Sequence, residues 1–253
     1  MLDTSGSMGF VTNPDEVEHT GQYGFEDGHQ VEYVHNGTPR ISVLNDAVRK
    51  MLHTFARYER DATEFLIAII TFGEDTRLAL PPSPASEVRF TDLVPCGETP
   101  LGRALEIAKE LIEDKTQIPS RAYRPVVILV SDGEPTDSYQ TQLDDFIRNG
   151  RTAKCDRMAL AITQEADRAM LAKFVEGTNH QVFEADTSDR ITDFFHFVTM
   201  SSVQRSMSRN PNIVPEDSHV QTPPPPPAMA PGAFAPSVKP ESKQQDDDDE
   251  GYW

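Results

Sequence analysis

The sequence predicts an α/β domain with a Rossmann-like, doubly wound and mostly parallel sheet flanked by helices. From about residue 40 to residue 202, apolar runs alternate with amphipathic segments, which is the order expected of parallel strands joined by helices. Two of these runs, residues 65–72 and 126–130, are apolar without alternation, as strands buried on both faces should be. We therefore expect one domain over residues 1–205, followed by a tail.

Apolar spacing places the individual elements. In chain order we expect a helix around 44–55, a strand over 65–72, a short strand around 77–80, a helix over 101–112, a strand over 126–130, a helix near 141–148, a strand over 158–162, a helix over 165–175, a short strand around 181–183 and a last helix from 188 onward. Thr99 is a natural N-cap for the second helix, with Pro100 at the favoured first position.

Two regions fall outside this alternation. Residues 9–40 form an inserted loop or hairpin, in which the alternation from Val31 to Val34 and the Asn36-Gly37 pair indicate paired strands. Residues 206–253 are rich in Pro, Ala, Ser and Gln and carry an acidic run at 246–250, so we expect a disordered tail. The acidic run with Tyr252-Trp253 is either a docking peptide for a basic groove or a solubilising end on a flexible spacer.

Charge and composition exclude several functions. A net charge of −18 and a pI near 4.7 argue against nucleic-acid and anionic-membrane partners, because both need concentrated Lys and Arg. No apolar stretch approaches the roughly 20 residues of a spanning helix, and no signal peptide is evident, so the expected compartment is cytoplasmic. Cys96 and Cys155 stand alone and are expected to be reduced thiols.

Oxygen-bearing side chains occur at three points where loops of such a fold converge. Asp3-Thr4-Ser5-Gly6-Ser7 offers a carboxylate and two hydroxyls on alternate residues, so one turn of loop can aim three oxygens at one point. Alone, this string is as typical of a capping loop. Thr99 precedes a predicted helix and Asp132 follows a predicted strand, and the carboxyl ends of parallel strands meet at the switch point of the sheet. Such ligands indicate Mg²⁺, Mn²⁺ or Ca²⁺.

The order of these motifs resembles the metal-ion-dependent adhesion site of von Willebrand factor A-type domains. The resemblance covers roughly residues 1–200 and implies one divalent cation, with Mg²⁺ as the expected ion, held by Asp3, Ser5, Ser7, Thr99 and Asp132. The hydroxyls would bind the metal directly, and the two aspartates directly or through water. The stretches Gly-Glu-Thr-Pro-Leu-Gly-Arg-Ala-Leu at 97–105 and Val-Ser-Asp-Gly-Glu-Pro-Thr-Asp at 130–137 are similar to bacterial TerY-type proteins of tellurium-resistance gene clusters.

This resemblance implies a metal-dependent protein-protein interaction module and not an enzyme. A partner's Asp or Glu would complete the metal coordination, and the TerY-like stretches imply a PP2C-type phosphatase and a protein kinase as partners in a bacterial stress or defence system. An adaptor subunit of a chelatase or AAA-type assembly is an alternative. A Mg²⁺-dependent phosphoryl-transfer enzyme is another, disfavoured because the sequence has no phosphate-binding Gly-rich loop, no kinase motif set and no evident Lys near the site.

The sequence departs from the family at its first strand. Only Met1 and Leu2 precede Asp3, whereas the family has a full central strand there. A late start, a fragment, unusual packing, or another chain that fills the gap would account for this, and we favour a late start. Glu98, Glu134 and Asp137 lie beside the expected ligands as either a partner-selecting rim or solvated loop carboxylates, with the second favoured. His19, His29 and His35 match no common zinc spacing.

Overall fold

A six-stranded, mostly parallel sheet forms the centre of the chain. The computed structural model describes residues 1–13, 17–26, 29–59, 63–208, 212 and 237–240. The strand order is β5-β4-β1-β6-β7-β8, and only the edge strand β5 runs antiparallel to its neighbour. The bounds are β1 Leu2–Asp3, β4 Leu66–Phe72, β5 Arg77–Pro84, β6 Val126–Ser131, β7 Asp156–Ile162 and β8 Val182–Ala185.

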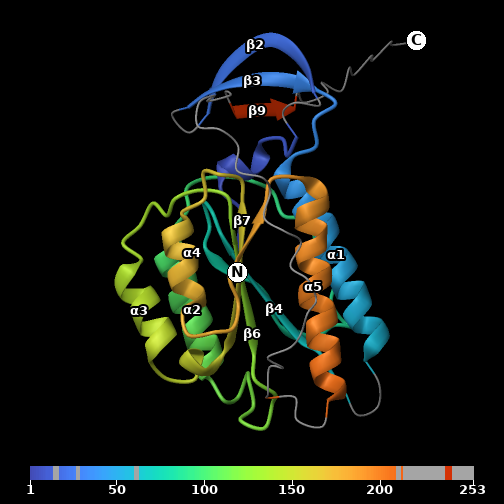
Figure 1. Ribbon diagram of the computed structural model, residues 1–253, viewed down its shortest axis with the longest axis vertical. Helices are drawn as coiled ribbons and strands as arrows, with labels where there is room; N and C mark the ends of the chain where they lie inside the picture. Colours follow the sequence, from blue (N-terminus) through green and yellow to red (C-terminus); the bar gives the residue numbers. More distant parts are fainter. Residues whose placement is uncertain (14–16, 27–28, 60–62, 209–211, 213–236, 241–253) are drawn as a thin grey trace, which may run out of the picture.

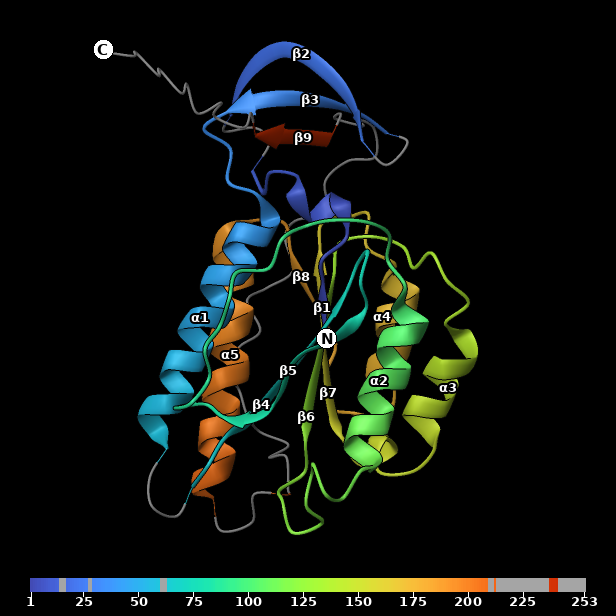
Figure 2. The same cartoon turned by 180° about the vertical axis from the view of Figure 1, so that it is seen from behind.

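Helices cover both faces of this sheet (Figures 1 and 2), which confirms the predicted fold class. On one face lie α1 (Arg40–Tyr58) and α5 (Ser188–Met207), and on the other α2 (Leu101–Glu113), α3 (Gln140–Arg148) and α4 (Arg168–Val175). The helices are amphipathic and bury their apolar stripes, those of α1 and α5 in one core and those of α2, α3 and α4 in the other. Two short 3-10 helices, η1 (Gly6–Gly9) and η3 (Thr152–Lys154), follow β1 and precede β7.

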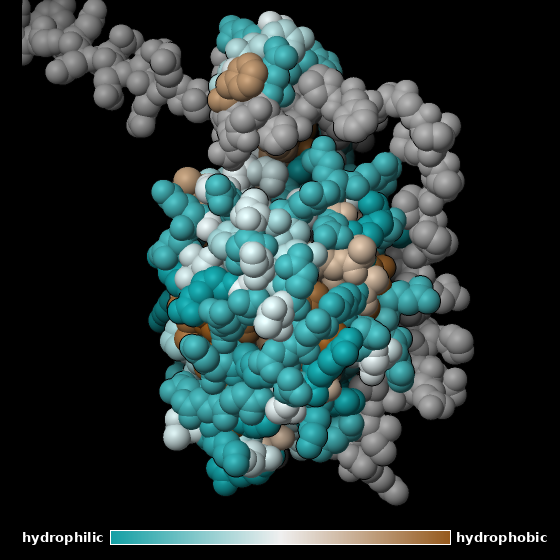
Figure 3. Space-filling model, turned by 90° about the vertical axis from the view of Figure 1, so that its left-hand side faces the viewer, coloured by the Kyte–Doolittle hydropathy of each residue, from teal (hydrophilic) through white to brown (hydrophobic). Residues whose placement is uncertain are grey.

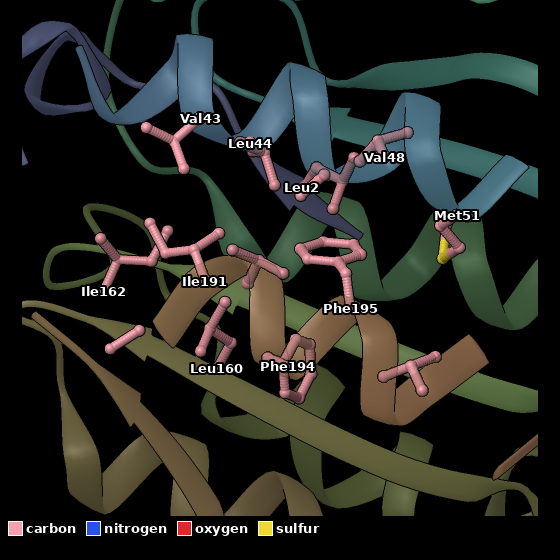
Figure 4. Close-up of a cluster of buried hydrophobic side chains, with 14 of the residues drawn as sticks. Leu2, Val43, Leu44, Val48, Met51, Leu160, Ile162, Ile191, Phe194 and Phe195 are labelled. Atoms are coloured by element: carbon pink, nitrogen blue, oxygen red, sulfur yellow. The ribbon is translucent and has the colours of Figure 1, made fainter. Parts of the chain in front are cut away.

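The sheet separates two apolar cores, and β1 contributes to both. Figure 4 shows Leu2 beside Leu44 and Val48 of α1, with Phe194 and Phe195 of α5 closing the same core. Met1 belongs to the opposite core under α2. Successive residues of an extended chain face opposite sides of a sheet, so Met1 and Leu2 enter different cores. Asp3 is the last residue of β1 and lies at its carboxyl end.

β1 is central although it comprises only two residues. It pairs in parallel with β4 through Leu2↔Thr71 and Asp3↔Phe72, and with β6 through Leu2↔Val130. The backbone continues these ladders, because Thr4 N–H donates to the Phe72 carbonyl at 2.8 Å and Val130 N–H to the Met1 carbonyl at 3.1 Å. The loop that begins at Thr4 is therefore held between β4 and β6.

A second, three-stranded sheet stands above the carboxyl end of the central sheet. In it β2 (Glu18–Glu26) and β3 (His29–His35) form the expected antiparallel hairpin, and β9 (Ser237–Pro240) adds in parallel to β3. The Asn36-Gly37 pair follows β3 and is not the connection between the two strands of this hairpin. The strands are joined at residues 27–28, which lie outside the described residues, and Asn36, with φ +60°, leads from β3 toward α1.

Three further expectations differ from the structure. Helix α2 begins at Leu101 with Pro100 as its N-cap and no side-chain cap from Thr99, because Pro100 has the non-helical ψ of 76°. Helix α4 begins at Arg168 and not at residue 165, because the Asp167 carboxylate caps it by accepting from Met170 N–H. In the predicted tail, α5 runs to Met207 and residues 237–240 form β9, while most of the remainder, including the acidic run, lies outside the described residues.

In the described part of the chain, no helix has the length and apolar character required to cross a membrane. Cys96 is exposed and Cys155 is buried.

Candidate metal site

The oxygen-bearing residues meet at the carboxyl end of the central sheet, beneath the β2–β3 hairpin (Figure 1). Asp3 ends β1, and Ser5 and Ser7 lie in the turn and the 3-10 helix that follow it. Asp132 comes directly after β6, the neighbour of β1. Residues 125 positions apart in the sequence are therefore in direct contact, as the hydrogen bond between Ser7 and Asp132 shows.

A chain of hydrogen bonds connects four of the five predicted ligands. Asp3 Oδ1 accepts from the backbone N–H of Ser5 at 2.9 Å, and the hydroxyls of Ser5 and Ser7 are 3.0 Å apart. Ser7 Oγ then donates to Asp132 Oδ1 at 2.8 Å. Both carboxylates are 0% exposed and Ser5 is 3% exposed. The structure thus gathers two carboxylates and two hydroxyls in one buried cluster.

Thr99 is held in its own loop by backbone and side-chain contacts. Its N–H donates to Thr136 Oγ1 at 3.1 Å, and its carbonyl accepts from Thr136 N–H at 3.0 Å. Two residues earlier, the Gly97 carbonyl accepts from Gly6 N–H at 2.9 Å, which joins this loop to the Asp3–Ser7 turn. Gly97 has φ +80°, and a Cβ there would lie 2.5 Å from the backbone of Glu74, so only glycine permits this approach.

Burial and the proximity of Asp132 perturb the Asp3 carboxyl. Desolvation and the charge of Asp132 raise the pKa of Asp3 from 3.8 to about 7, against the opposing effect of hydrogen bonds from Ser5 and Ser131. Ser131 Oγ donates to Asp3 Oδ2 at 2.8 Å. Two neighbouring buried carboxylates repel each other when both are ionised, and a cation between or beside them would relieve this repulsion.

Arg40 is the charged partner that sequence reasoning missed. Its Nη1 donates to Asp132 Oδ2 at 2.9 Å and lies 3.4 Å from the Ser7 carbonyl. The residue is 7% exposed, and its guanidinium lies over the Phe10 ring at 5.7 Å. Arg40 begins α1, 92 residues before Asp132, and no short motif signals such a pair.

The acidic neighbours of the site separate into two kinds. Asp137 caps α2, because Oδ1 accepts from Gly102 N–H at 3.0 Å and Oδ2 from Arg103 N–H at 3.2 Å. This fixed role is neither the rim nor the solvated loop carboxylate that the sequence suggested. Glu98 and Glu134 are exposed beside Thr99 and Asp132. For these two residues, solvated loop carboxylates stay the favoured prediction, with a partner-selecting rim as the alternative.

The donor set suits a hard divalent cation. Carboxylate and hydroxyl oxygens are the ligands that Mg²⁺, Mn²⁺ and Ca²⁺ prefer, and Asp3, Ser5, Ser7 and Asp132 present them together. Within the described ranges no cluster of three or more His, Cys, Asp or Glu side chains could hold a metal, so any cation bound here would depend on hydroxyl oxygens. His19 instead lies 3.1 Å from Glu32 Oε2 within the hairpin.

Comparison with known proteins identifies the fold. A family model described as the von Willebrand factor type A domain matches residues 1–134. A search of curated proteins gives no match. Among solved structures, proximal thread matrix protein 1 from the mussel byssus, with a zinc-occupied MIDAS motif, is similar at 14% identity and a TM-score of 0.52 over 80% of this chain and 46% of that one.

Two bacterial structures are similar in the same way. A von Willebrand factor type A protein from Catenulispora acidiphila has 15% identity and a TM-score of 0.51, over 80% of this chain and 41% of its own. The PilB minor pilin D319A mutant from Streptococcus sanguinis has 12% identity and a TM-score of 0.50, over 80% and 60%. The matched region is less than two thirds of each of these longer proteins, and at such identities the likeness concerns the fold.

Proposed function

The chain belongs to the von Willebrand factor type A domain family, and from that premise we propose that it binds a partner protein through a divalent cation. In this proposal Asp3, Ser5, Ser7, Thr99 and Asp132 hold the ion, and a carboxylate of the partner completes its coordination. Domains of this family are typically interaction modules and not enzymes. The observation that carries the proposal is the hydrogen-bonded cluster of Asp3, Ser5, Ser7 and Asp132.

The charges at the site favour an acidic partner. With both aspartates ionised, Asp3, Asp132 and Arg40 carry one net negative charge, and a divalent ion would leave the site positive. Neutral hydroxyl ligands do not offset that charge, so an incoming Glu or Asp is a strong additional ligand. The whole chain has a net charge of −18, so the metal-loaded site would be a local positive charge on an acidic protein.

The hairpin adds apolar contact surface at the same end of the molecule. Tyr23 and Phe25 of β2 are 57% and 76% exposed. Figure 3 shows one small hydrophobic area on the otherwise hydrophilic surface of the hairpin. Exposed aromatic side chains are enriched at protein-protein interfaces, where they anchor the partner. We assign the hairpin to the partner-binding face.

The finer assignments rest on the sequence stretches at 97–105 and 130–137. We assign the protein to the TerY-like subgroup, with Mg²⁺ as the resident ion and a PP2C-type phosphatase and a protein kinase as partners in a bacterial stress or tellurium-resistance system. The alternative is an adaptor role in a chelatase or AAA-type assembly. We assign residues 1–205 to the domain and 9–40 to its insertion, an assignment supported by the packing of α5 against α1.

Partner binding with and without metal tests this proposal. The chain would be mixed with the candidate phosphatase or kinase in Mg²⁺ and in EDTA, and Thr99→Val would be compared with Thr199→Val. Both threonines are buried, but Thr199 lies on α5 and its hydroxyl donates to the Phe195 carbonyl, away from the cluster. We expect binding only with metal, lost in Thr99→Val and retained in Thr199→Val. Equal binding by all forms, with or without metal, would contradict the proposal.

A further inference from the structure

A pocket lies beside the candidate metal site, on the face of the central sheet that carries α1. Its volume is about 490 Å³, within the range of about 300 to 1,000 Å³ that is usual for ligand pockets. Strands β4 and β5 contribute to one wall and residues 89–96 to the other. Figure 2 shows the segment that joins β5 to α2 running beside α1 and then over the carboxyl end of the sheet.

The interior of the pocket is largely apolar. Ile69 of β4 is 5% exposed, and Leu80 of β5 is partly buried against the same core. Phe90 and Leu93 pack against that core from the other wall. Thr71, two residues after Ile69, is also 5% exposed and lines the pocket near the end of β4. An apolar side chain placed in this pocket would therefore be removed from water, which favours binding.

Hydrogen bonds hold the segment 89–96 in place, so the pocket is already formed. Asn45 of α1 donates through Nδ2 to the Leu93 carbonyl at 3.0 Å and accepts through Oδ1 from Leu93 N–H at 2.9 Å. Further along, Cys96 N–H donates to the Thr4 carbonyl, and the Cys96 carbonyl accepts from Glu74 N–H, both at 2.8 Å. A preformed pocket needs less ordering when it is filled, so more of the contact energy is available for binding.

The same backbone connects the pocket to the metal site. Thr4 lines the pocket and stands between the candidate ligands Asp3 and Ser5 in the sequence. Cys96 lines it as well and precedes Gly97, whose carbonyl accepts a backbone hydrogen bond from the ligand-bearing turn. Consecutive Cα atoms are about 3.8 Å apart, so the near end of the pocket lies within roughly 10 Å of these ligands, the span of about three extended residues.

Arg89 places a positive charge at the other end of the pocket. It lies seven residues before Cys96, and seven extended residues span at most about 25 Å. The acidic side chains that line the pocket interact with neighbours: Asp75 binds Arg77, Asp92 binds Arg49, and Glu74 accepts from the Cys96 thiol. Arg89 is exposed and forms no ion pair with any residue that the structure describes. A carboxylate from outside the chain is therefore a favourable partner for it.

We propose that this pocket receives an apolar side chain of the partner protein, about three residues from the acidic residue that binds the metal, with a second carboxylate of the same segment at Arg89. This assignment rests on the proposed function of the metal site and specifies the partner's segment as acidic, apolar and acidic in order. The metal fixes the position of the segment, and the pocket adds contact area that one carboxylate lacks. Partner selection then depends on the apolar residue as well as on charge.

Peptides with one Glu in an alanine background test the pocket in the full-length chain with Mg²⁺. A single Leu would be placed two, three or four residues to either side of the Glu, and binding followed by fluorescence anisotropy of a terminal label. Burial of the leucine side chain predicts about tenfold tighter binding at the matching spacing than for the peptide without Leu. Equal affinity at every spacing and without Leu would refute the assignment.

The thiol of Cys96 shows whether the peptide occupies the pocket. Cys96 is exposed and lines the pocket, whereas Cys155 is 1% exposed and serves as the internal reference. The rate at which N-ethylmaleimide alkylates Cys96, followed by mass spectrometry, should fall severalfold when the Leu-containing peptide saturates the chain. The peptide without Leu should protect Cys96 much less at the same saturation. Equal protection by the two peptides would mean that the Leu side chain does not enter the pocket.

A matched pair of charge variants tests Arg89. Arg89→Gln removes the cation at the pocket, and Arg121→Gln removes another exposed cation in the segment before β6, at the amino end of that strand. The peptide would carry a second Glu beyond the Leu, on the side away from the first. At low salt we expect Arg89→Gln to weaken its binding about threefold and Arg121→Gln to leave it unchanged. Equal affinity of the two variants would exclude Arg89 from the contact.

The same titrations in EDTA distinguish failure of this assignment from failure of the proposed function. If Glu-containing peptides bind with Mg²⁺ but Leu adds nothing, the pocket assignment is refuted and the metal site stands. If the Leu-containing peptide binds equally with and without metal, the pocket acts alone, which refutes recognition by pocket and metal together. If no peptide binds in either condition, the proposed function fails, and the pocket assignment fails with it.

Discussion

Arg40 forms an ion pair with Asp132, so its replacement tests most specifically how charge is compensated at the site. The substitution Arg40→Met keeps an apolar stem but leaves a fully buried carboxylate without its guanidinium partner. Breaking a buried ion pair from one side costs about 3 to 5 kcal/mol. In EDTA we therefore expect the free energy of unfolding to fall by that amount.

A divalent cation should restore part of this loss. Without the guanidinium, the site repels the ion less, so we expect Arg40→Met to bind Mg²⁺ at least tenfold more tightly than the wild type, or about 1.4 kcal/mol. With saturating metal, the stability gap between variant and wild type narrows by the same amount. Urea unfolding followed by far-UV circular dichroism, in EDTA and in Mg²⁺, measures both quantities.

Arg205→Met is the matched control for this experiment. Arg205 pairs with buried Asp156 at 2.7 Å and is 8% exposed, so its loss breaks a buried ion pair of the same kind away from the site. It should destabilise the chain by a similar amount, reduced to the extent that His180, 3.0 Å from Asp156, supplies compensating charge. Metal should not narrow the difference in the free energy of unfolding between Arg205→Met and the wild type. If metal restores Arg205→Met as much as Arg40→Met, or restores neither, the assigned role of Arg40 is incorrect.

Three further predictions follow from the same geometry. The pKa of Asp3 is raised from 3.8 to about 7 in the folded chain, so between these values the folded state keeps a proton on Asp3 that the unfolded state has lost. Without metal, the contribution of Asp3 to the free energy of unfolding should therefore fall, by up to about 4 kcal/mol, as pH rises from 4 to 7, and comparison with Asp3→Asn in urea titrations should isolate this fall. A metal must displace this proton, so calorimetric Mg²⁺ affinity should rise with pH up to about 7, and an affinity that is flat in pH would argue against Asp3 as a ligand. Gly97→Ala should lower the free energy of unfolding by about 2 to 3 kcal/mol and weaken metal binding, because φ +80° and the 2.5 Å approach to Glu74 force the Thr99 loop to move. In the control Gly133→Ala, the added Cβ would meet only Ser7 Oγ at 4.0 Å, so thermal or urea unfolding should change little.

Much of the architecture could be predicted because buried strands and amphipathic helices leave periodic signals. The runs at 65–72 and 126–130 became β4 and β6 with nearly the expected bounds. Where the prediction was wrong, the deciding contacts were distant in sequence. The start of α2 depends on Asp137, which caps it across 35 residues, and no local pattern at Thr99-Pro100 reveals that partner.

The candidate site was predictable as a set of loops but not as a network. The spacing of Asp3, Ser5 and Ser7 indicated three oxygens on one turn, and the structure places these residues against Asp132 as the sheet order requires. Arg40 and Ser131 were not anticipated, because each acts through a contact that only the folded sheet creates. β9 could not be foreseen either, since its pairing depends on the open edge of β3 and not on its own composition.

The most direct test of the proposed metal site is calorimetric titration of Mn²⁺ and Mg²⁺ into the full-length chain and into Asp3→Asn/Asp132→Asn. In both proteins Asp246–Asp249 are changed to Asn and Glu250 to Gln, so that the acidic run cannot bind the ion and only the site contributes. We predict one bound ion per chain in the first protein, none in the second, and binding of a Glu-containing peptide only to the metal-loaded first protein. Equal metal binding by the two proteins, or peptide binding unaffected by metal, would contradict the account.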